Sequence, residues 1–531
     1  MASFLASTDF NAADLAGNVT HAITSHLPEA WAPHVEKLWG PWAAYATLAI
    51  VWTYLYDFGS RVYRDRRMRK FGAPPPVVPF RLPFAIDLAL YSLYKNARHS
   101  LFPLVSSWLD AVPGRTVEMR TFATGLIFTD EPANIKGIMQ TKWSSFGRGE
   151  VTRRIWGDML GDTQIFVVDG EDWHKSKDRI KDHVSKLRPT DLLITEQHAQ
   201  KLFARFDVNK PVEVFDLVDR YQLDVVTEVF FGESAESLTS EPPFRKPMDT
   251  LHPINTMRML FGKNAYYVKD KYLAPKALRD LNAYCYGMAD KVYARDLSKK
   301  SLEEYTMLEE LASQKKSPQE IKESMMSIML GGKDPSAILI SWAIFLAGKH
   351  PNVFLKMKEE VERVCGSRPP TPHDIKHFTY IRYVINETFR LYHPLGLNVR
   401  EALEDTTLPT GGGKSGKEPL AVAKGTTVIY SLGGMQRRKD IWGEDATVFR
   451  PERWEGASVD RWHFIPYNHG PRHCIGRVFG QQQMEYILAR ICQEYEDIRI
   501  PPGQPEQRIR IELNLKMAYP CMVEFVRKKK E

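Results

Sequence analysis

Cysteine is scarce in this chain of 531 residues, and its arrangement does not favour covalent cross-links. The five cysteines are Cys285, Cys365, Cys474, Cys492 and Cys521. Their number is odd, they are widely scattered, and no two have the C-x-x-C spacing of structural zinc sites and redox motifs. This pattern argues against a disulfide framework, and we expect most of the chain to lie in a reducing compartment.

Internal repeats, low-complexity blocks and long linkers are missing after about residue 80. With 43% hydrophobic and 26% charged residues, the composition is that of a globular protein and not of a disordered one. We therefore expect one large domain of roughly 450 residues. The formal charge of +7 would suit nucleic acid, anionic lipid or an acidic protein, and charge alone does not choose among them. We expect no nucleic-acid partner.

Charged residues are absent from the 19 positions between Leu38 and Tyr56, a run that would measure about 28 Å as a helix. Aromatic residues lie toward its ends, as they do at membrane interfaces. Six basic residues follow the run: Arg61, Arg64, Arg66, Arg67, Arg69 and Lys70. This pattern predicts a single N-terminal transmembrane helix, with the C-terminal body in the cytosol. The alternative is a buried core helix.

The N-terminal part of the chain is divided by these features into three segments. Residues 1–37 would be luminal, which would make Asn18 a glycosylation acceptor, and residues 38–58 would form the anchor. Because no basic residue precedes Lys37, we do not expect a cleavable secretory signal. The basic and proline-rich residues 59–83 favour an extended, stiff tether. The main domain would cover residues 84–531.

The clearest helix signal begins at Ser317, which can cap a helix whose first turn holds Pro318 and Glu320. This helix would run to Lys349 and measure about 48 Å, enough to cross the domain. The overall pattern predicts a mainly α fold with small β-sheets.

A loop near the C-terminus, Tyr467 to Gly476, reads Y-N-H-G-P-R-H-C-I-G and has glycines on both sides of Cys474. Glycines let backbone amides approach a cysteine sulfur, and hydrogen bonds from those amides tune the potential of an iron that the sulfur ligates. Arg472 offers paired donors to a carboxylate. For an isolated cysteine, a small buried residue in an ordinary turn would be the better interpretation.

This loop resembles the cysteine-ligand signature F-x-x-G-x-R-x-C-x-G of the cytochrome P-450 family, with Tyr467 in place of phenylalanine. Two further motifs follow the family's order. Glu387 and Arg390 match its E-x-x-R pair, and Arg453 resembles the third member that locks the pair. Such a pair alone would be read as a solvated helix face. The resemblance implies a haem-thiolate monooxygenase fold, haem b ligated by Cys474, and a structural role for the triad.

The resemblance also implies how the haem propionates are held. Arg400 resembles the family's strand arginine, and Trp173 resembles the tryptophan of a helix that meets the propionates. Lys177 stands where this helix usually has arginine, so the charge is kept and the paired donors are lost. Together with Arg472 and Cys474, these residues form the expected cofactor-binding set.

The oxygen-side helix holds Gly331-Gly332-Lys333-Asp334-Pro335-Ser336, similar to the family's A/G-G-x-D/E-T-T, in which the acid and first threonine deliver protons. Here the first threonine is Pro335, which cannot donate a proton and whose ring clashes with the carbonyl four residues earlier. We therefore expect a kink at Gly331-Gly332. Asp334, Ser336 or water would supply protons.

Other segments resemble the fungal alkane and fatty-acid hydroxylases, across roughly residues 75 to 520. The resemblance implies monooxygenation of a lipophilic substrate at the endoplasmic reticulum membrane. Since the chain has no flavin or nicotinamide domain, NADPH would feed electrons through a separate flavoprotein reductase. Fatty-acyl, alkyl and secondary-metabolite substrates all remain open. One alternative keeps the fold but rearranges or dehydrates an oxygenated substrate without consuming dioxygen, because of Pro335. Another is a non-catalytic, membrane-tethered protein that binds haem or lipid.

Overall fold

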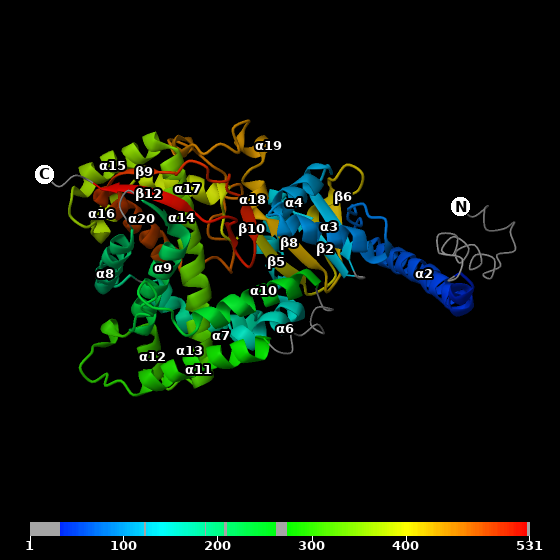
Figure 1. Ribbon diagram of the computed structural model, residues 1–531, viewed down its shortest axis with the longest axis horizontal. Helices are drawn as coiled ribbons and strands as arrows, with labels where there is room; N and C mark the ends of the chain where they lie inside the picture. Colours follow the sequence, from blue (N-terminus) through cyan, green and yellow to red (C-terminus); the bar gives the residue numbers. More distant parts are fainter. Residues whose placement is uncertain (1–31, 122–123, 186, 207–209, 262–272, 528–531) are drawn as a thin grey trace.

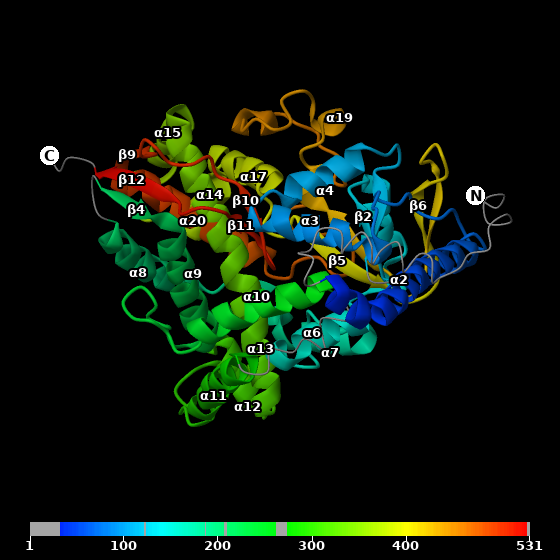
Figure 2. The same ribbon diagram turned by 45° about the vertical axis from the view of Figure 1, so that its right-hand side comes forward.

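The structure is a computed structural model that describes residues 32–121, 124–185, 187–206, 210–261 and 273–527. Most of the described chain is helical, and its strands form small sheets, which confirms the predicted fold class. Figures 1 and 2 show the helices gathered at one side of the body and the largest sheet at the other, next to α2 (Ala32–Met68). Asn18 lies outside the described residues.

The helices of the body are as follows: α3 (Ile86–Ala97), α4 (Leu101–Asp110), α5 (Pro132–Lys136), α6 (Gly149–Leu160), α7 (Gly170–Ser185), α8 (Pro189–Arg205), α9 (Val214–Phe231), α10 (Arg245–Phe261), α11 (Leu273–Tyr293), α12 (Met307–Ser313), α13 (Pro318–Ile328), α14 (Asp334–Lys349), α15 (Pro351–Cys365), α16 (Pro372–His377), α17 (Tyr380–Leu391), α18 (Leu432–Met435), α19 (Lys439–Trp442) and α20 (Arg477–Glu494). Short 3-10 turns are η1 (Pro83–Ala85), η3 (Trp143–Ser145), η5 (Leu302–Glu304) and η7 (Pro451–Trp454), and π-helical turns are η2 (Gly137–Thr141) and η6 (Met329–Lys333).

The largest sheet has the order β1-β2-β8-β5-β3, in which β2 and β8 are parallel and the other pairs antiparallel. The remaining sheets are β4-β12-β9, β10-β11 and β6-β7. The strands are β1 (Thr116–Thr121), β2 (Thr124–Thr129), β3 (Phe146–Gly147), β4 (Pro211–Glu213), β5 (Leu397–Ala402), β6 (Thr406–Gly412), β7 (Glu418–Val422), β8 (Thr427–Ser431), β9 (Tyr495–Arg499), β10 (Ile509–Ile511), β11 (Leu515–Met517) and β12 (Met522–Arg527).

The long helix predicted from Ser317 is present and crosses the body as α13, η6 and α14. The Ser317 hydroxyl accepts a hydrogen bond from the backbone N–H of Glu320, which confirms the predicted cap. Among the described residues, this helix is the one long and apolar enough to cross a membrane. However, 78% of its apolar window is buried, and α14 lies in the main hydrophobic core, so it serves here as a core helix.

At Gly331-Gly332, where we predict a kink, residues 329–333 form the π-helical turn η6, which ends two residues before Pro335. Proline has no backbone N–H to donate to the carbonyl of Gly331, and its ring crowds that carbonyl. A wider turn relieves both conflicts while the helix continues on each side.

The helix α2 contains the predicted membrane-spanning run and continues through part of the basic segment to Met68. Its C-terminal end is attached to the body by ion pairs: Arg64 pairs with Glu118, and Asp65 pairs with Arg120 at 2.5 Å. The proline-rich residues that follow also contact the body, because the N–H of Glu118 donates to the carbonyl of Pro76 at 2.7 Å. The segment between helix and body is therefore held in place over much of its length.

Candidate active site

The loop that carries Cys474 is fixed by its own backbone. The N–H of Cys474 donates to the carbonyl of Tyr467 at 2.8 Å, and Asn468 and Gly470 both have positive φ. A Cβ atom at Gly470 would collide with the backbone carbonyl of Met139. Glycine is therefore required at this position both by conformation and by close packing.

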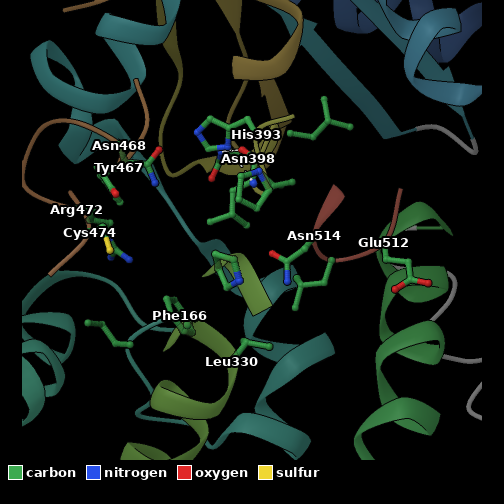
Figure 3. Close-up of a pocket in the computed structure, with 18 of the residues that line it drawn as sticks. Phe166, Leu330, His393, Asn398, Tyr467, Asn468, Arg472, Cys474, Glu512 and Asn514 are labelled. Carbon is green, nitrogen blue, oxygen red and sulfur yellow. Dashed lines mark hydrogen bonds between the residues drawn. The ribbon is translucent and has the colours of Figure 1, made fainter. Parts of the chain in front are cut away.

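The side chain of Cys474 is accessible because it faces an internal cavity of about 470 Å³ (Figure 3). The surrounding protein nevertheless buries the thiol, and this burial raises its pKa. The backbone N–H of Gly476 and the charge of Arg477 act in the opposite direction. A metal ligated by this sulfur would favour the thiolate further.

Tyr467 lines the same cavity, and its ring packs edge-on against Phe389 with 5.1 Å between centroids. Burial raises its pKa, so the phenol is neutral. No described residue forms a hydrogen bond with its hydroxyl. The ring is therefore held by packing against Phe389, and the hydroxyl lies near the Cys474 thiol without a partner among the described residues.

Three arginines converge on the cavity near Cys474: Arg148, Arg400 and Arg472. Arg472 donates to Asp169 at 2.6 Å, and the Arg148 Nε is buried without an acceptor among the described residues. Burial lowers the pKa of Arg148, and the charges of Arg400 and Arg472 lower it further. Burial and Arg400 likewise lower the pKa of Arg472 to about 10. Three like charges near one carboxylate make a site that favours an additional anion.

Trp173 and Lys177, both on α7, lie beside this arginine cluster. The Trp173 ring is buried, with the Lys177 ammonium 5.0 Å and the Arg472 guanidinium 4.8 Å from its centroid. Lys177 lines the cavity, so its charge adds to that of the three arginines. The structure therefore brings together all five members of the predicted cofactor-binding set: Trp173, Lys177, Arg400, Arg472 and Cys474.

This arrangement fits the haem that the sequence resemblance implies. One end of the cavity offers a sulfur ligand and a cluster of cations suited to two propionates, and the rest of the lining is largely apolar. Two participants were missed from the sequence, namely Arg148 and Asp169. No local motif marks either residue: Asp169 meets Arg472 across 303 positions of sequence, and Arg148 comes near Arg400 and Arg472 only in the folded chain.

The predicted triad is assembled away from the cavity. Arg390 donates to both oxygens of Glu387 at 2.9 and 2.8 Å, and the pair is fully buried. Arg453 reaches Glu387 at 3.3 Å, and the Trp454 indole donates to it at 3.1 Å. Arg390 also donates to the carbonyl of Gln436, which precedes the cysteine loop in the chain. These contacts tie α17 to the segment that precedes Cys474.

The π-helical turn places Gly331, Pro335 and Ser336 on the cavity wall. The Ser336 side chain is buried, and its Oγ lies against Gly480, so that a Cβ atom there would be 3.6 Å from the oxygen. Gly480 lies on α20 and also lines the cavity, so the Ser336 hydroxyl is held between two helices of the cavity wall.

Unlike Ser336, Asp334 forms ion pairs with neighbouring lysine side chains. Lys333 contacts it at 2.6 Å and also contacts Asp219 of α9 at 2.7 Å, while Lys516 lies 3.8 Å away. Burial alone would raise the pKa of Asp334, but the charges of Lys333 and Lys516 outweigh it and hold the pKa well below its usual range. An ionised carboxylate held in this way is a poor proton donor at neutral pH.

Comparison of the sequence with known proteins finds matches to one protein family. The family model described as cytochrome P450 matches residues 76–522. The cytochrome P450 monooxygenase pvhE of Talaromyces variabilis is 31% identical over 494 residues, covering 86% of this chain and 90% of its own. Cytochrome P450 52A5 of Candida maltosa is 34% identical over 415 residues, covering 73% and 78%. Cytochrome P450 52A3-A of the same yeast is 32% identical over 399 residues, covering 70% and 76%.

Proposed function

The chain belongs to the cytochrome P450 family and is a haem-thiolate monooxygenase, and we propose that it inserts one oxygen atom from dioxygen into a lipophilic substrate. The substrate would be an alkyl, fatty-acyl or secondary-metabolite compound. The observation that carries this proposal is the position of the Cys474 sulfur at one end of a mostly apolar cavity. Haem b would be the cofactor, with Cys474 as iron ligand and NADPH electrons arriving through a flavoprotein reductase.

When bound, the haem supplies dioxygen activation, and a thiolate ligand favours cleavage of the oxygen–oxygen bond. The protein's own residues would hold and enclose it. Arg148, Arg400 and Arg472 would pair with its propionates, with Trp173 and Lys177 beside them. Apolar side chains such as Phe166, Leu330 and Leu513 would exclude water and bind the hydrocarbon part of the substrate.

Proton supply is the point at which this chain departs from its family, because Pro335 has no hydroxyl. We propose that Ser336 holds the transferable proton at its Oγ, since this hydroxyl lies on the cavity wall. Asp334 would act indirectly, through the charge it contributes. Replacing Ser336 with alanine should lower the product formed per NADPH consumed, and Asp334→Ala tests the neighbouring acid. Unchanged coupling in both variants would contradict a relay through either residue.

We also propose that α2 anchors the protein in the endoplasmic reticulum membrane, with residues 38–58 spanning it and the body in the cytosol. The helix α2 is less apolar than the α13–α14 helix, so the support is instead the exposure of large apolar side chains along its described part, including Leu48, Ile50, Trp52 and Leu55. Alkaline carbonate extraction of microsomes should leave the full chain in the membrane fraction. Release into the soluble fraction would contradict an integral anchor.

The decisive experiment supplies the protein with reductase, NADPH and isotopically labelled dioxygen, together with alkanes, fatty acids and lipophilic metabolites. One labelled oxygen atom in a product, read by mass spectrometry, is the expected result. Pro335 favours a second candidate, oxygen-independent rearrangement or dehydration of an oxygenated substrate. Unlabelled product formed without NADPH would establish this second activity and overturn the first. Haem that no reductase can reduce would point to a non-catalytic binding protein.

A further inference from the structure

The hairpin between β10 and β11 reaches into the cavity from the side opposite Cys474. Ile511 pairs with Leu515, which leaves Glu512, Leu513 and Asn514 as a three-residue turn, and all three line the cavity. Figure 3 shows Asn514 and Glu512 across the cavity from Cys474. Asn514 is only 3% exposed, so its amide group belongs to the interior and not to solvent.

The orientation of the Asn514 amide is fixed by its neighbour. Its Nδ2 lies 3.1 Å from Asp334 Oδ2. Because Asp334 is ionised by its two lysine neighbours, it can only accept a hydrogen bond, so the amide nitrogen of Asn514 must face it. The amide oxygen of Asn514 is therefore turned the other way, toward the cavity (Figure 3).

This oxygen is an acceptor without a donor. No described residue donates a hydrogen bond to Asn514 Oδ1, although the surrounding wall is largely apolar. Because Asn514 lines the cavity, this oxygen can be reached by water or by the donor group of a ligand, which would satisfy the acceptor. The acceptor lies on a turn held in place at two points, by Asp334 and by the N–H of Leu515, which donates to the carbonyl of Pro394 at 2.7 Å.

We propose that Asn514 Oδ1 accepts a hydrogen bond from the substrate, which is therefore a long apolar molecule with one donor group, such as a hydroxyl, and not a plain hydrocarbon. Asp334 acts as a positioning residue that sets the direction of the Asn514 amide. This inference rests on the proposed oxidation of a lipophilic substrate. The ion pairs of Asp334 are compatible with this positioning role, whereas they disfavour proton donation by its carboxyl group.

The test measures ligand affinity by spin-state titration of the full-length, haem-loaded protein with lauryl alcohol, lauryl methyl ether and dodecane. The alcohol and the ether share an oxygen, but only the alcohol has a donor. We expect the alcohol to bind roughly three- to tenfold more tightly than the ether. Asn514→Leu should abolish this ratio and leave dodecane affinity nearly unchanged. Asp334→Asn should reduce the ratio, because the amide of Asn514 is no longer held in one direction.

Leu513→Ala is the matched control, because it alters the same turn without changing a polar group. It should weaken all three ligands alike and keep the ratio of alcohol to ether. The ferrous carbon monoxide spectrum confirms that each variant keeps thiolate ligation. Equal binding of alcohol and ether by the parent protein, or equal losses for both in Asn514→Leu, would overturn the inference alone. If no ligand shifts the spin state of correctly ligated enzyme, and no alkyl compound is oxidised, the proposed function fails as well.

Discussion

Removal of the Arg148 charge should affect the haem-loaded and haem-free proteins in different directions. In the haem-free protein, Arg148 is half-buried beside Arg400 and Arg472 with its Nε fully buried, and this environment lowers its pKa. A neutral side chain of similar polarity, as in Arg148→Gln, therefore removes an unfavourable charge. With haem bound, the same substitution removes a cation that would pair with a propionate.

The size of each effect follows from the burial of the site. A hydrogen bond to a charged group contributes about 1.5–3 kcal/mol, which corresponds to haem dissociation roughly 10- to 150-fold faster in the variant. The haem-free variant should be as stable as the parent, or more stable by up to about 1 kcal/mol, because the repulsion from two neighbouring arginines is relieved. Only a residue that serves the bound cofactor gives this combination of results.

The assay transfers haem to an excess of apomyoglobin and measures the release rate, while urea denaturation reports the stability of the haem-free protein. Arg153→Gln is the matched control, because Arg153 lies on the neighbouring α6 and is 53% exposed, with a 3.8 Å contact to Asp162. It should change neither quantity by more than a small factor. Unchanged haem release in Arg148→Gln, or a destabilised haem-free variant, would refute the reasoning.

Three further predictions concern stability. Burial lowers the pKa of His393 to about 4, below its usual 6.5, so its stabilising contribution is complete above about pH 6.5 and decreases by up to about 3 kcal/mol as the pH falls to 4. His393→Gln should flatten the pH dependence of the urea midpoint, and an identical dependence would contradict this. Glu387→Gln should cost about 3–5 kcal/mol, because Arg390 stays buried without its counter-charge; a loss below about 1 kcal/mol in urea unfolding would disprove it. Arg67→Ala breaks an exposed pair with Asp405 and should change the free energy of unfolding by less than about 1 kcal/mol in the same assay.

The parts of the site that could be predicted are those written in short stretches of sequence. Cys474 and Arg472 share one loop, and Glu387 and Arg390 share one helical turn, so their spacing alone brings them together. The interruption of the long helix also followed from one local fact, the missing N–H of Pro335. Each of these predictions needed only backbone geometry within a few residues.

The parts that could not be predicted depend on contacts between distant segments. The sequence offered Asp334, Ser336 or water as proton sources, but it did not show that Lys516, 182 positions after Asp334, acts with Lys333 to keep this acid ionised. Asn514 gains its direction only because it meets Asp334 in the folded chain. The residues of one helix do not show which charged side chains from other segments will contact that helix in the folded chain.

The attachment of α2 to the body also limits where the chain can be cut to remove the proposed membrane anchor for crystallisation. Glu118 is fully buried and relies on Arg64 of the helix as well as on Arg120, which is itself paired with Asp65. A truncation that removes everything before the prolines would leave Glu118 with a weakened counter-charge at the edge of the largest sheet. The practical boundary therefore falls ahead of Arg61, within α2, so that the apolar turns are lost and the basic turns remain.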